Sequence, residues 1–378
     1  MVKDDPGILR KLDDFLGKPV ERKSAPNKDD LISLLKQSAD LIRTAVDYKV
    51  LLIFLFYKAI SDKYVAKVEK FKNEGYSEED AYILANNEFI TLYDEQTKDL
   101  LTWNKVTKNR DVIKGLSEAL IKIAKLNPEI SDLQKLLEVT GLLGFITEDN
   151  AHILTRIIEL FNRYDFSEVD YDVIGDAYQW ILSYFAPTRG KEGEVYTPKE
   201  IIRLIVNLLD ISNGSSVLDP ACGSGAMLIE SYKHVREKGE EPNLDLKGQE
   251  LNEVIVVIAK MNLLLHGITG KIYYGNSLTN PKFDQADYVI ANPPWNQDGY
   301  DENNLSDPKV RHIYNSVVSG GYTNSNSADW AWVQLMNYYA KSKVGVVLDQ
   351  GALFRGGKEQ LIRRGFIEKD MIEAVILL

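Results

Sequence analysis

The chain has 378 residues, 44% of them hydrophobic and 27% charged, and its 45 basic and 56 acidic side chains give a net charge of −11. The single cysteine, Cys222, excludes an internal disulfide framework and a thiolate-rich metal site. A domain that binds nucleic acid on its own is more often basic, so a role on DNA would need a local contact surface or a partner.

The start of the chain carries no apolar signal core. Its longest apolar run, residues 50–57, is far shorter than the roughly 20 residues of a membrane-spanning helix. The length suits two domains, at about 150 residues or more for each. We therefore expect a two-domain cytoplasmic protein with no membrane partner.

Residues 1–165 are expected to form a helical domain. Apolar side chains recur at helical spacing from residue 31 to 45, with polar side chains between them. The next run, residues 50–60, is apolar on most sides, which is typical of a helix buried among other helices. Gly75, the Asn127-Pro128 pair and Gly141 mark breaks between later helices.

Residues 166–378 follow a different pattern, in which short β-rich runs alternate with helical stretches. We predict strands at 216–219, 244–250, 271–274, 288–291 and 344–348, and helices at 226–235 and 252–266. Such alternation is typical of an α/β domain with a doubly wound parallel sheet, which binds ligands at the carboxyl ends of its strands. Residues 374–378 also read as a strand, and a terminus within a strand suggests that the C-terminal part is truncated.

The first predicted strand ends in a glycine-rich turn, residues 219–225, with the sequence Asp-Pro-Ala-Cys-Gly-Ser-Gly. Glycines let such a turn approach a ligand closely. A dinucleotide-binding turn would place another small residue where this chain has Leu228, and would bind a pyrophosphate. The Asp219-Pro220 opening instead suits a cationic ligand without a phosphate, such as a sulfonium amino acid.

Glu250 ends the second predicted strand, where a carboxylate conventionally accepts hydrogen bonds from ribose hydroxyls. Each feature is weak alone, because glycines occur in many turns and most glutamates are simply solvated. Their register on consecutive strands favours a site for a nucleoside cofactor. Cys222 has no evident base beside it and is expected to fill space, and the four histidines share no spacing that would bind a metal.

The fourth predicted strand runs directly into Asn292-Pro293-Pro294-Trp295. An exocyclic amine on an aromatic ring is a poor nucleophile, because its lone pair is delocalised into the ring. The Asn292 side-chain oxygen and the Pro293 carbonyl could accept both of its N–H groups and localise that lone pair. Trp295 offers a face for a flipped-out base, worth ~1–3 kcal/mol. A strand that merely ends at a proline is the structural alternative, but the cofactor-type turn in the same sheet favours catalysis.

Several motifs in one order resemble the modification (methylation) subunit of type I restriction–modification systems. They are residues 194–199, 218–225, 248–251, 291–295 and 353–357, together with 52–63 in the helical half. The resemblance implies a prokaryotic DNA methyltransferase that transfers a methyl group from S-adenosylmethionine to adenine N6. It also implies an α/β architecture, in which the N-terminal helical domain precedes a Rossmann-like methyltransferase domain, residues 166–378.

The same resemblance assigns roles to individual residues. The adenine would be held by Asn292, Pro293, Pro294 and Trp295. The cofactor would be bound by Glu194, Val195, Tyr196, Thr197, Pro198, Lys199, Asp219, Gly223, Ser224, Gly225, Glu250 and Asn276. Two positions depart from the family pattern, since Asn276 stands where related enzymes often have Asp, and Trp295 stands where they have Phe or Tyr.

The implied partners are DNA, a DNA-specificity subunit, a restriction (nuclease or translocase) subunit and a second copy of the chain. Two other hypotheses remain open. The Asn-Pro-Pro-aromatic motif also serves methyltransferases that act on protein glutamine or on RNA amines, and a degenerate cofactor-binding scaffold would need no activity. The long helical half and the Tyr196-Thr197-Pro198 segment favour DNA over protein, and intact Asn292 and Glu250 favour an enzyme over a scaffold.

Overall fold

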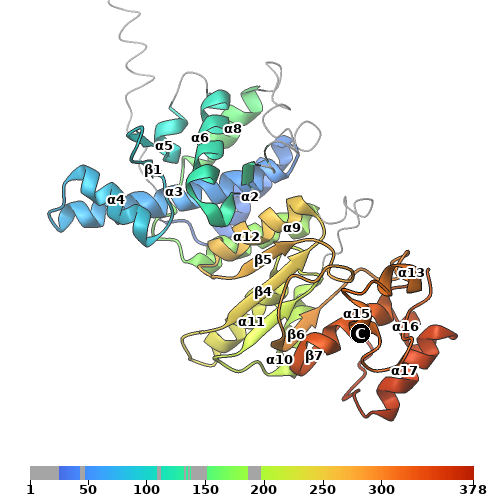
Figure 1. Ribbon diagram of the computed structural model, residues 1–378. Coiled ribbons are helices and arrows are strands. Elements are labelled where there is room, and N and C mark those ends of the chain that lie inside the picture. The colour runs from blue at the N-terminus through green and yellow to red at the C-terminus, as the bar shows by residue number, and fades with distance from the viewer. Residues whose placement is uncertain are drawn as a thin grey trace, which may run out of the picture.

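The computed structural model describes residues 25–42, 47–108, 112–131, 133–134, 137, 151–185 and 197–378. These residues form a helical part and an α/β part built on one parallel sheet, which meet along helices α9 and α12 (Figure 1). The mixed α/β class predicted from the sequence is thus confirmed. No helix among the described residues is both long enough and apolar enough to cross a lipid bilayer.

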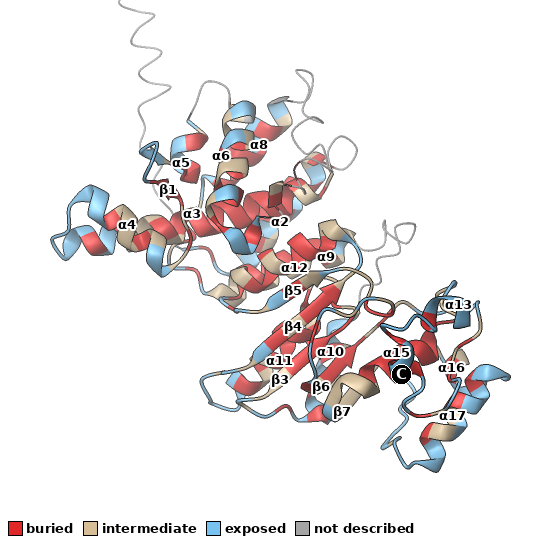
Figure 2. Ribbon diagram, viewed as in Figure 1, coloured by how far each residue is buried: buried red, intermediate tan, exposed pale blue. Residues whose placement is uncertain are grey.

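The helical part surrounds one buried helix, α3, which Figure 2 shows in the buried colour over most of its length. Its residues 50–60 are all buried, as the apolar run predicts, because neighbouring helices cover every side of it. The elements of this part are α2 (Lys28–Ile42), α3 (Lys49–Asn73), α4 (Glu78–Glu88), β1 (Tyr93–Asp94), β2 (Asp99–Leu100), α5 (Trp103–Val106), α6 (Val112–Leu126), the 3-10 turn Pro128–Ile130, α8 (Ala151–Phe161) and α9 (Tyr171–Phe185).

The α/β part contains five parallel strands in the order β5-β4-β3-β6-β7. The strands are β3 (Ser216–Asp219), β4 (Asp245–Glu250), β5 (Lys271–Tyr274), β6 (Ala286–Ala291) and β7 (Ala340–Val346). The first strand along the chain, β3, lies in the middle of the sheet. The next two, β4 and β5, are added on one side of it, and β6 and β7 are then added on the other side. Doubly wound sheets bind their ligands outside the carboxyl ends of the strands at such a reversal, which here are β3 and β6.

Helices cover both faces of this sheet. Alternate residues of a strand point to opposite faces, so Val217 packs beneath α10 (Lys199–Leu209), α11 (Ala226–Glu237) and α12 (Glu253–Leu265). Leu218 faces the other layer, in which α15 (Asp329–Tyr339) lies against β6 and β7. The remaining helices are α13 (Glu302–Leu305), α14 (Arg311–Tyr314), α16 (Gly351–Phe354) and α17 (Lys358–Glu368).

Two predicted strands near the C-terminus differ from the structure. The strand expected at 344–348 is β7, which begins earlier, at Ala340, and ends at Val346. The prediction of a strand at 374–378 is wrong, since residues 374–378 are exposed and have no regular secondary structure. Its apolar side chains fit a strand, but a strand also needs a neighbour for its backbone hydrogen bonds, and no described strand pairs with it.

The helical core extends past the domain boundary expected near residue 166. Buried side chains of α9 belong to it, and so does one face of α12, including Ile258 and Met261, whereas Val256 and Ala259 face the sheet. Gly175 allows this contact, because a Cβ at that position would overlap the His266 ring just after α12. α12 is therefore buried on two sides, and the boundary itself stays a prediction.

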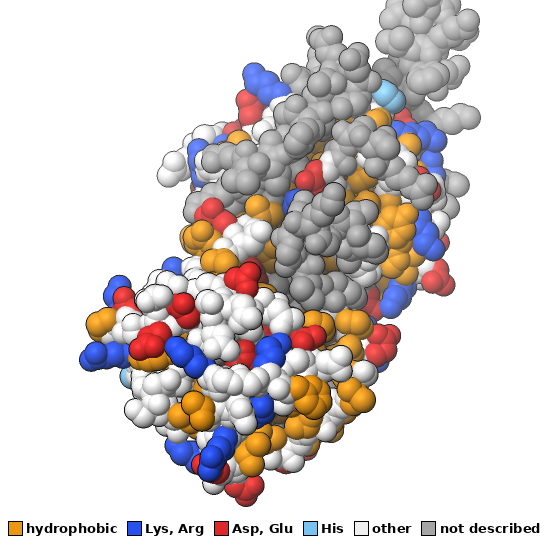
Figure 3. All heavy atoms as spheres, turned by 90° about the vertical axis from the view of Figure 1, so that its right-hand side faces the viewer, with side chains coloured by type: hydrophobic (Ala, Val, Ile, Leu, Met, Phe, Trp, Pro, Cys, Tyr) orange, Lys and Arg blue, Asp and Glu red, His pale blue; other side chains and the backbone are white. Residues whose placement is uncertain are grey.

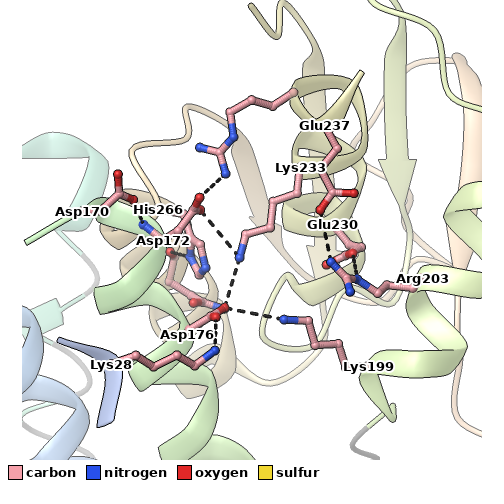
Figure 4. A network of polar contacts seen from close by, with 12 residues as sticks. Lys28, Asp170, Asp172, Asp176, Lys199, Arg203, Glu230, Lys233, Glu237 and His266 are labelled. Atoms are coloured by element: carbon pink, nitrogen blue, oxygen red, sulfur yellow. Dashed lines mark hydrogen bonds and ion pairs between the residues drawn. The ribbon is translucent and has the colours of Figure 1, made fainter. Parts of the chain in front are cut away.

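An ion-pair network crosses the same junction (Figure 4). The Asp176 carboxylate of α9 is met by Lys28 Nζ at 2.6 Å, Lys233 Nζ at 3.2 Å and Lys199 Nζ at 3.7 Å. Burial opposes ionisation, but these three lysines hold the pKa of Asp176 well below its ordinary value. The network joins α2 of the helical part to α10 and α11 of the α/β part, and Lys199 directly follows the Thr197-Pro198 pair.

Candidate functional site

The turn after β3 combines two left-handed glycines. Gly223 has a φ of 50° and Gly225 a φ of 81°, a conformation that glycine adopts without steric cost. Gly225 precedes α11, and a Cβ there would come within 2.8 Å of the Leu263 side chain of α12. A Cβ at Gly223 would meet no atom within 4 Å, so the turn leaves open space on that side.

Glu250 closes this turn from the end of β4. Its Oε2 accepts a hydrogen bond from the Gly223 N–H at 3.1 Å, and its Oε1 accepts one from the Asn252 N–H at 2.8 Å. The Cys222 N–H donates to the Gln249 carbonyl at 3.1 Å, and Gly248 is small enough for Cys222 to pack against it. The structure therefore brings together the two features that the sequence placed on consecutive strands.

Asp219 lies buried beneath the turn, with 2% of its surface exposed. It accepts a hydrogen bond from the Ala221 N–H at 3.0 Å. Burial, together with the nearby Glu250 carboxylate, raises the pKa of Asp219 to about 8 despite that hydrogen bond. A cation brought close to Asp219 would favour its charged form, which suits a positively charged ligand. Burial also raises the pKa of the Cys222 thiol, which makes Cys222 a poor nucleophile.

Asn276 lies in the loop after β5, at the same edge of the sheet as the turns after β3 and β4, and its side chain stabilises this loop. Its Oδ1 accepts from the Leu278 N–H at 3.0 Å, and its Nδ2 donates to the Tyr300 hydroxyl at 2.8 Å. The next residue, Ser277, donates its hydroxyl to the Pro220 carbonyl at 2.6 Å. An aspartate at position 276 could keep the first contact, but it has no N–H to donate to Tyr300. No sequence motif indicated Tyr300, which is an isolated aromatic residue in a loop.

Asn292 lies at the end of β6, beside the segment that leads into α10. Its Nδ2 donates to Thr197 Oγ1 at 2.8 Å, and its Oδ1 accepts from the indole Nε1 of Trp295 at 2.9 Å. The same indole N–H also points to the Val347 carbonyl at 3.3 Å. Pro293 is buried, whereas 43% of Trp295 is exposed. Thr197, expected at the cofactor, thus contacts the residue assigned to the acceptor amine.

The other candidate residues lie around these contacts. The Ser224 carbonyl accepts from Asn262 Nδ2 at 2.8 Å, Pro198 precedes the first turn of α10, and Pro294 is half-buried. Lys199 stands apart, because its ammonium pairs with Asp176 at the junction. Glu194, Val195 and Tyr196 lie outside the described residues. The roles given to all of these residues stay predictions.

Two family models match most of the chain. The model described as N-6 DNA Methylase matches residues 169–378, and the model described as HsdM N-terminal domain matches residues 31–161. The resemblance found in the motifs is confirmed, since each of the two parts of the chain matches its own model.

Similar proteins agree with these models. The chain is 59% identical, over its whole length, to the type I restriction enzyme MjaVII methylase subunit of Methanocaldococcus jannaschii, and covers 66% of that protein. It is 54% identical, over 93% of its length, to the MjaVIII methylase subunit of the same organism, and covers 62% of it. The chain thus spans just under two thirds of the length of these curated relatives.

Solved structures show the same fold. A type I restriction–modification methyltransferase subunit from Streptococcus thermophilus superposes with a TM-score of 0.74 over 91% of this chain and 79% of its own, at 22% identity. A modification subunit of a putative type I restriction enzyme from Vibrio vulnificus gives a TM-score of 0.63 over 91% of this chain and 76% of its own, at 19% identity. By the family model that matches residues 169–378, the chain belongs to the N-6 DNA methylase family, and its curated relatives are type I restriction enzyme methylase subunits.

Proposed function

We propose that the chain is the methylation subunit of a type I restriction–modification complex and methylates the N6 amino group of adenine in DNA. The observation that carries this proposal is the position of Asn292. Its amide nitrogen donates a hydrogen bond to Thr197. Its amide oxygen is therefore oriented toward Trp295, whose indole is partly exposed. An acceptor oxygen beside a flat aromatic face is what an amine on a flipped base requires.

The cofactor that fits this site is S-adenosylmethionine. The residues agree with a cationic nucleoside, because Asp219 is buried and poised to ionise beside a cation, and the turn leaves open space at Gly223. When bound, the cofactor supplies an electrophilic methyl group on sulfur. Gly223 and Gly225 would shape the space for its methionine part, and Glu250, already fixed by two backbone N–H groups, would accept from its ribose.

The protein's own residues would activate the amine by holding its hydrogens. Asn292 Oδ1 and the Pro293 carbonyl accept the two N–H groups, so the nitrogen lone pair is directed at the methyl carbon. The amine nitrogen would take the methyl group, the sulfur would leave as a neutral thioether, and the amine would release one proton to water, since neither acceptor is a base. Trp295 must first withdraw its own N–H from Asn292, and its ring can then stack on the base. The rest of the rate comes from positioning.

The acceptor is proposed to be DNA, read with the help of other subunits. The family match to N-6 DNA methylases favours DNA over a protein glutamine or an RNA amine. The chain is acidic overall, and on the face in Figure 3 basic and acidic side chains of the described residues are interspersed. Specific reading needs phosphate and base-edge contacts, so we assign recognition to a separate specificity subunit in the prokaryotic cytoplasm. A restriction subunit and a second copy of the chain would complete the complex.

A transfer assay with a tritiated methyl donor tests this function. DNA, RNA and protein are offered as acceptors, with and without a candidate specificity subunit. We expect label in DNA adenine N6 only, efficiently and at a defined sequence when the specificity subunit is present. Label in protein or RNA would support the alternative acceptors. Efficient methylation of one defined sequence by the isolated chain would contradict the need for a partner.

A further inference from the structure

The segment after β7 carries a motif, residues 353–357, to which the proposed function gives no role. Arg355 lies in it, between α16 and α17, and its side chain returns to the loop that follows β6. Its Nη1 donates to Asn296 Oδ1 at 2.7 Å, although the two residues are 59 positions apart. Asn296 is the residue directly after Trp295, so Arg355 contacts the loop that presents the Asn-Pro-Pro-Trp motif.

Asn296 is held on two sides. Its backbone has a left-handed φ of 51°, and its N–H donates to Asp329 Oδ1 at 2.9 Å. Asp329 is the first residue of α15 and is fully buried. Its other carboxylate oxygen pairs with Arg355 Nη2. Arg355 therefore binds both the side chain of Asn296 and the carboxylate that holds the Asn296 backbone.

Arg355 is itself firmly placed. Its Nε donates to Glu359 Oε2 at 2.8 Å, and Glu359 is also fully buried. The backbone of its segment is fixed by Trp330 Nε1, which donates to the Ala352 carbonyl at 2.8 Å. Gly351 leaves room for the guanidinium, because a Cβ there would overlap Arg355 Nη1 and come within 2.6 Å of Asp349 Oδ1. These contacts tie the guanidinium to α15 and α17.

From these contacts we infer that Arg355 is a positioning residue, which sets the place of Trp295 and Asn292 by fixing Asn296. This inference rests on the proposed function of the Asn-Pro-Pro-Trp motif. A guanidinium offers several N–H donors in a rigid fork, so it can reach Asn296, Asp329 and Glu359 at once, which a lysine ammonium does less well. Because methyl transfer depends on geometry, a displacement of about 1 Å at the motif can slow it by roughly a hundredfold.

The first test compares variants in the methyl-transfer assay with DNA and the complete complex. Arg355→Ala is uninformative, because it leaves two buried carboxylates without a cation and can prevent folding. Arg355→Lys keeps a positive charge, and Asn296→Gly keeps the left-handed backbone but removes the side chain. We expect single-turnover rates roughly 30- to 100-fold lower in both variants, with cofactor Kd changed by less than about twofold. Asn296→Asp keeps the acceptor oxygen and should stay within about threefold of the wild type.

A matched control comes from α17, the helix that follows Arg355. Arg364 pairs with Glu368 four residues later, the same spacing as between Arg355 and Glu359, but the Arg364 pair is exposed, and no described contact joins Arg364 to the loop after β6. Arg364→Ala should leave the rate unchanged. A wild-type rate for Arg355→Lys and Asn296→Gly, or an equal loss in Arg364→Ala, would overturn the inference.

Backbone hydrogen exchange supplies a readout that needs no activity. In Arg355→Lys, a peptide covering residues 295–299 should exchange faster than in the wild type, while peptides from α10 and α11 keep their protection. A purely structural role would instead raise exchange throughout the α/β part and weaken cofactor binding as well. If the wild type methylates no DNA, the proposed function fails, and the exchange measurement still decides whether Arg355 fixes this loop.

Discussion

Trp295 donates its indole N–H to Asn292 Oδ1 at 2.9 Å, and so occupies the oxygen that the proposed reaction needs for the acceptor amine. In the proposed reaction, a base can therefore reach this oxygen only after Trp295 turns away. Relatives with Phe or Tyr at this position would lack the indole N–H. The hydrogen bond to Asn292 therefore depends on the tryptophan that distinguishes this chain from the family pattern.

Trp295→Phe should relieve this competition and keep a stacking face. Losing one neutral hydrogen bond in the free protein is worth about 0.5–1.5 kcal/mol, so DNA should bind equally well or up to about tenfold more tightly, with no loss of rate. Trp295→Ala removes the face as well, and should cost ~1–3 kcal/mol of base binding. Fluorescence of a 2-aminopurine placed at the target base measures both variants. Equal impairment of the two would show that the indole N–H does not block the site.

Glu250→Gln should weaken cofactor binding by roughly 1.5–3 kcal/mol, the range for losing a charged hydrogen bond. Glutamine keeps one acceptor oxygen for the backbone N–H of Gly223 or Asn252, so the turn should remain folded. Titration calorimetry gives the affinity, and a melting curve serves as the folding control. Unchanged affinity in a folded variant would remove Glu250 from the cofactor site.

The raised pKa of Asp219 predicts how stability and cofactor affinity change with pH. Its folded pKa of about 8 lies above the ordinary value, so the free protein loses stability as pH rises from about 4 through about 8. A bound cation favours the carboxylate, so cofactor affinity should rise with pH up to about 8, by at most about tenfold per unit, with release of a proton. Calorimetry in buffers of different ionisation enthalpy measures that proton.

Asp219→Asn supplies the control for this pH dependence. It should stabilise the free protein at pH 8 but not at pH 4, and should flatten the dependence of cofactor affinity on pH. A wild-type affinity that is independent of pH between 6 and 8, with no proton released, would mean that Asp219 does not respond to the ligand.

Gly175→Ala tests the packing between α9 and the end of α12. The added methyl group would overlap the His266 ring, and overpacking of this kind costs about 1–3 kcal/mol in the free energy of unfolding. Gly356→Ala is the matched control, because the nearest atom to a Cβ there is Gln360 Oε1 at 3.9 Å. Urea unfolding compares the two variants. Equal stability of both would show that the junction accommodates the methyl group.

The sequence predicted the sheet well where strands end in recognisable turns. β3 and β5 were placed to the residue, because a β-rich run stops at Asp219 and at the Tyr274-Gly275 pair. The start of β7 was predicted four residues too late. The strand lies at the edge of the sheet and includes the polar residues Lys341, Ser342 and Lys343, which do not form an apolar run. The run at 374–378 shows the converse, since strand-like composition forms no strand without a paired neighbour.

The residues of the site could be predicted from the sequence, but the contacts between their side chains could not. Motif spacing brought Gly223 and Glu250 to one edge, because parallel strands end together. Side-chain orientation decided the rest, such as the hydrogen bond of Trp295 to Asn292 and the ion pair that draws Lys199 to Asp176. The contact of Arg355 with the loop after β6 depends on the tertiary fold, and no local pattern in the sequence indicates it.

The proposed reaction depends most directly on Asn292, and one measurement tests this role: single-turnover methyl transfer to DNA by Asn292→Ala, with cofactor affinity measured on the same preparation. Removing a group that acts on the reacting atoms should lower the rate by roughly a hundredfold or more. Cofactor affinity should stay nearly intact, because Asn292 is assigned to the amine. A variant that methylates adenine at close to the wild-type rate would show that Asn292 does not hold the acceptor amine.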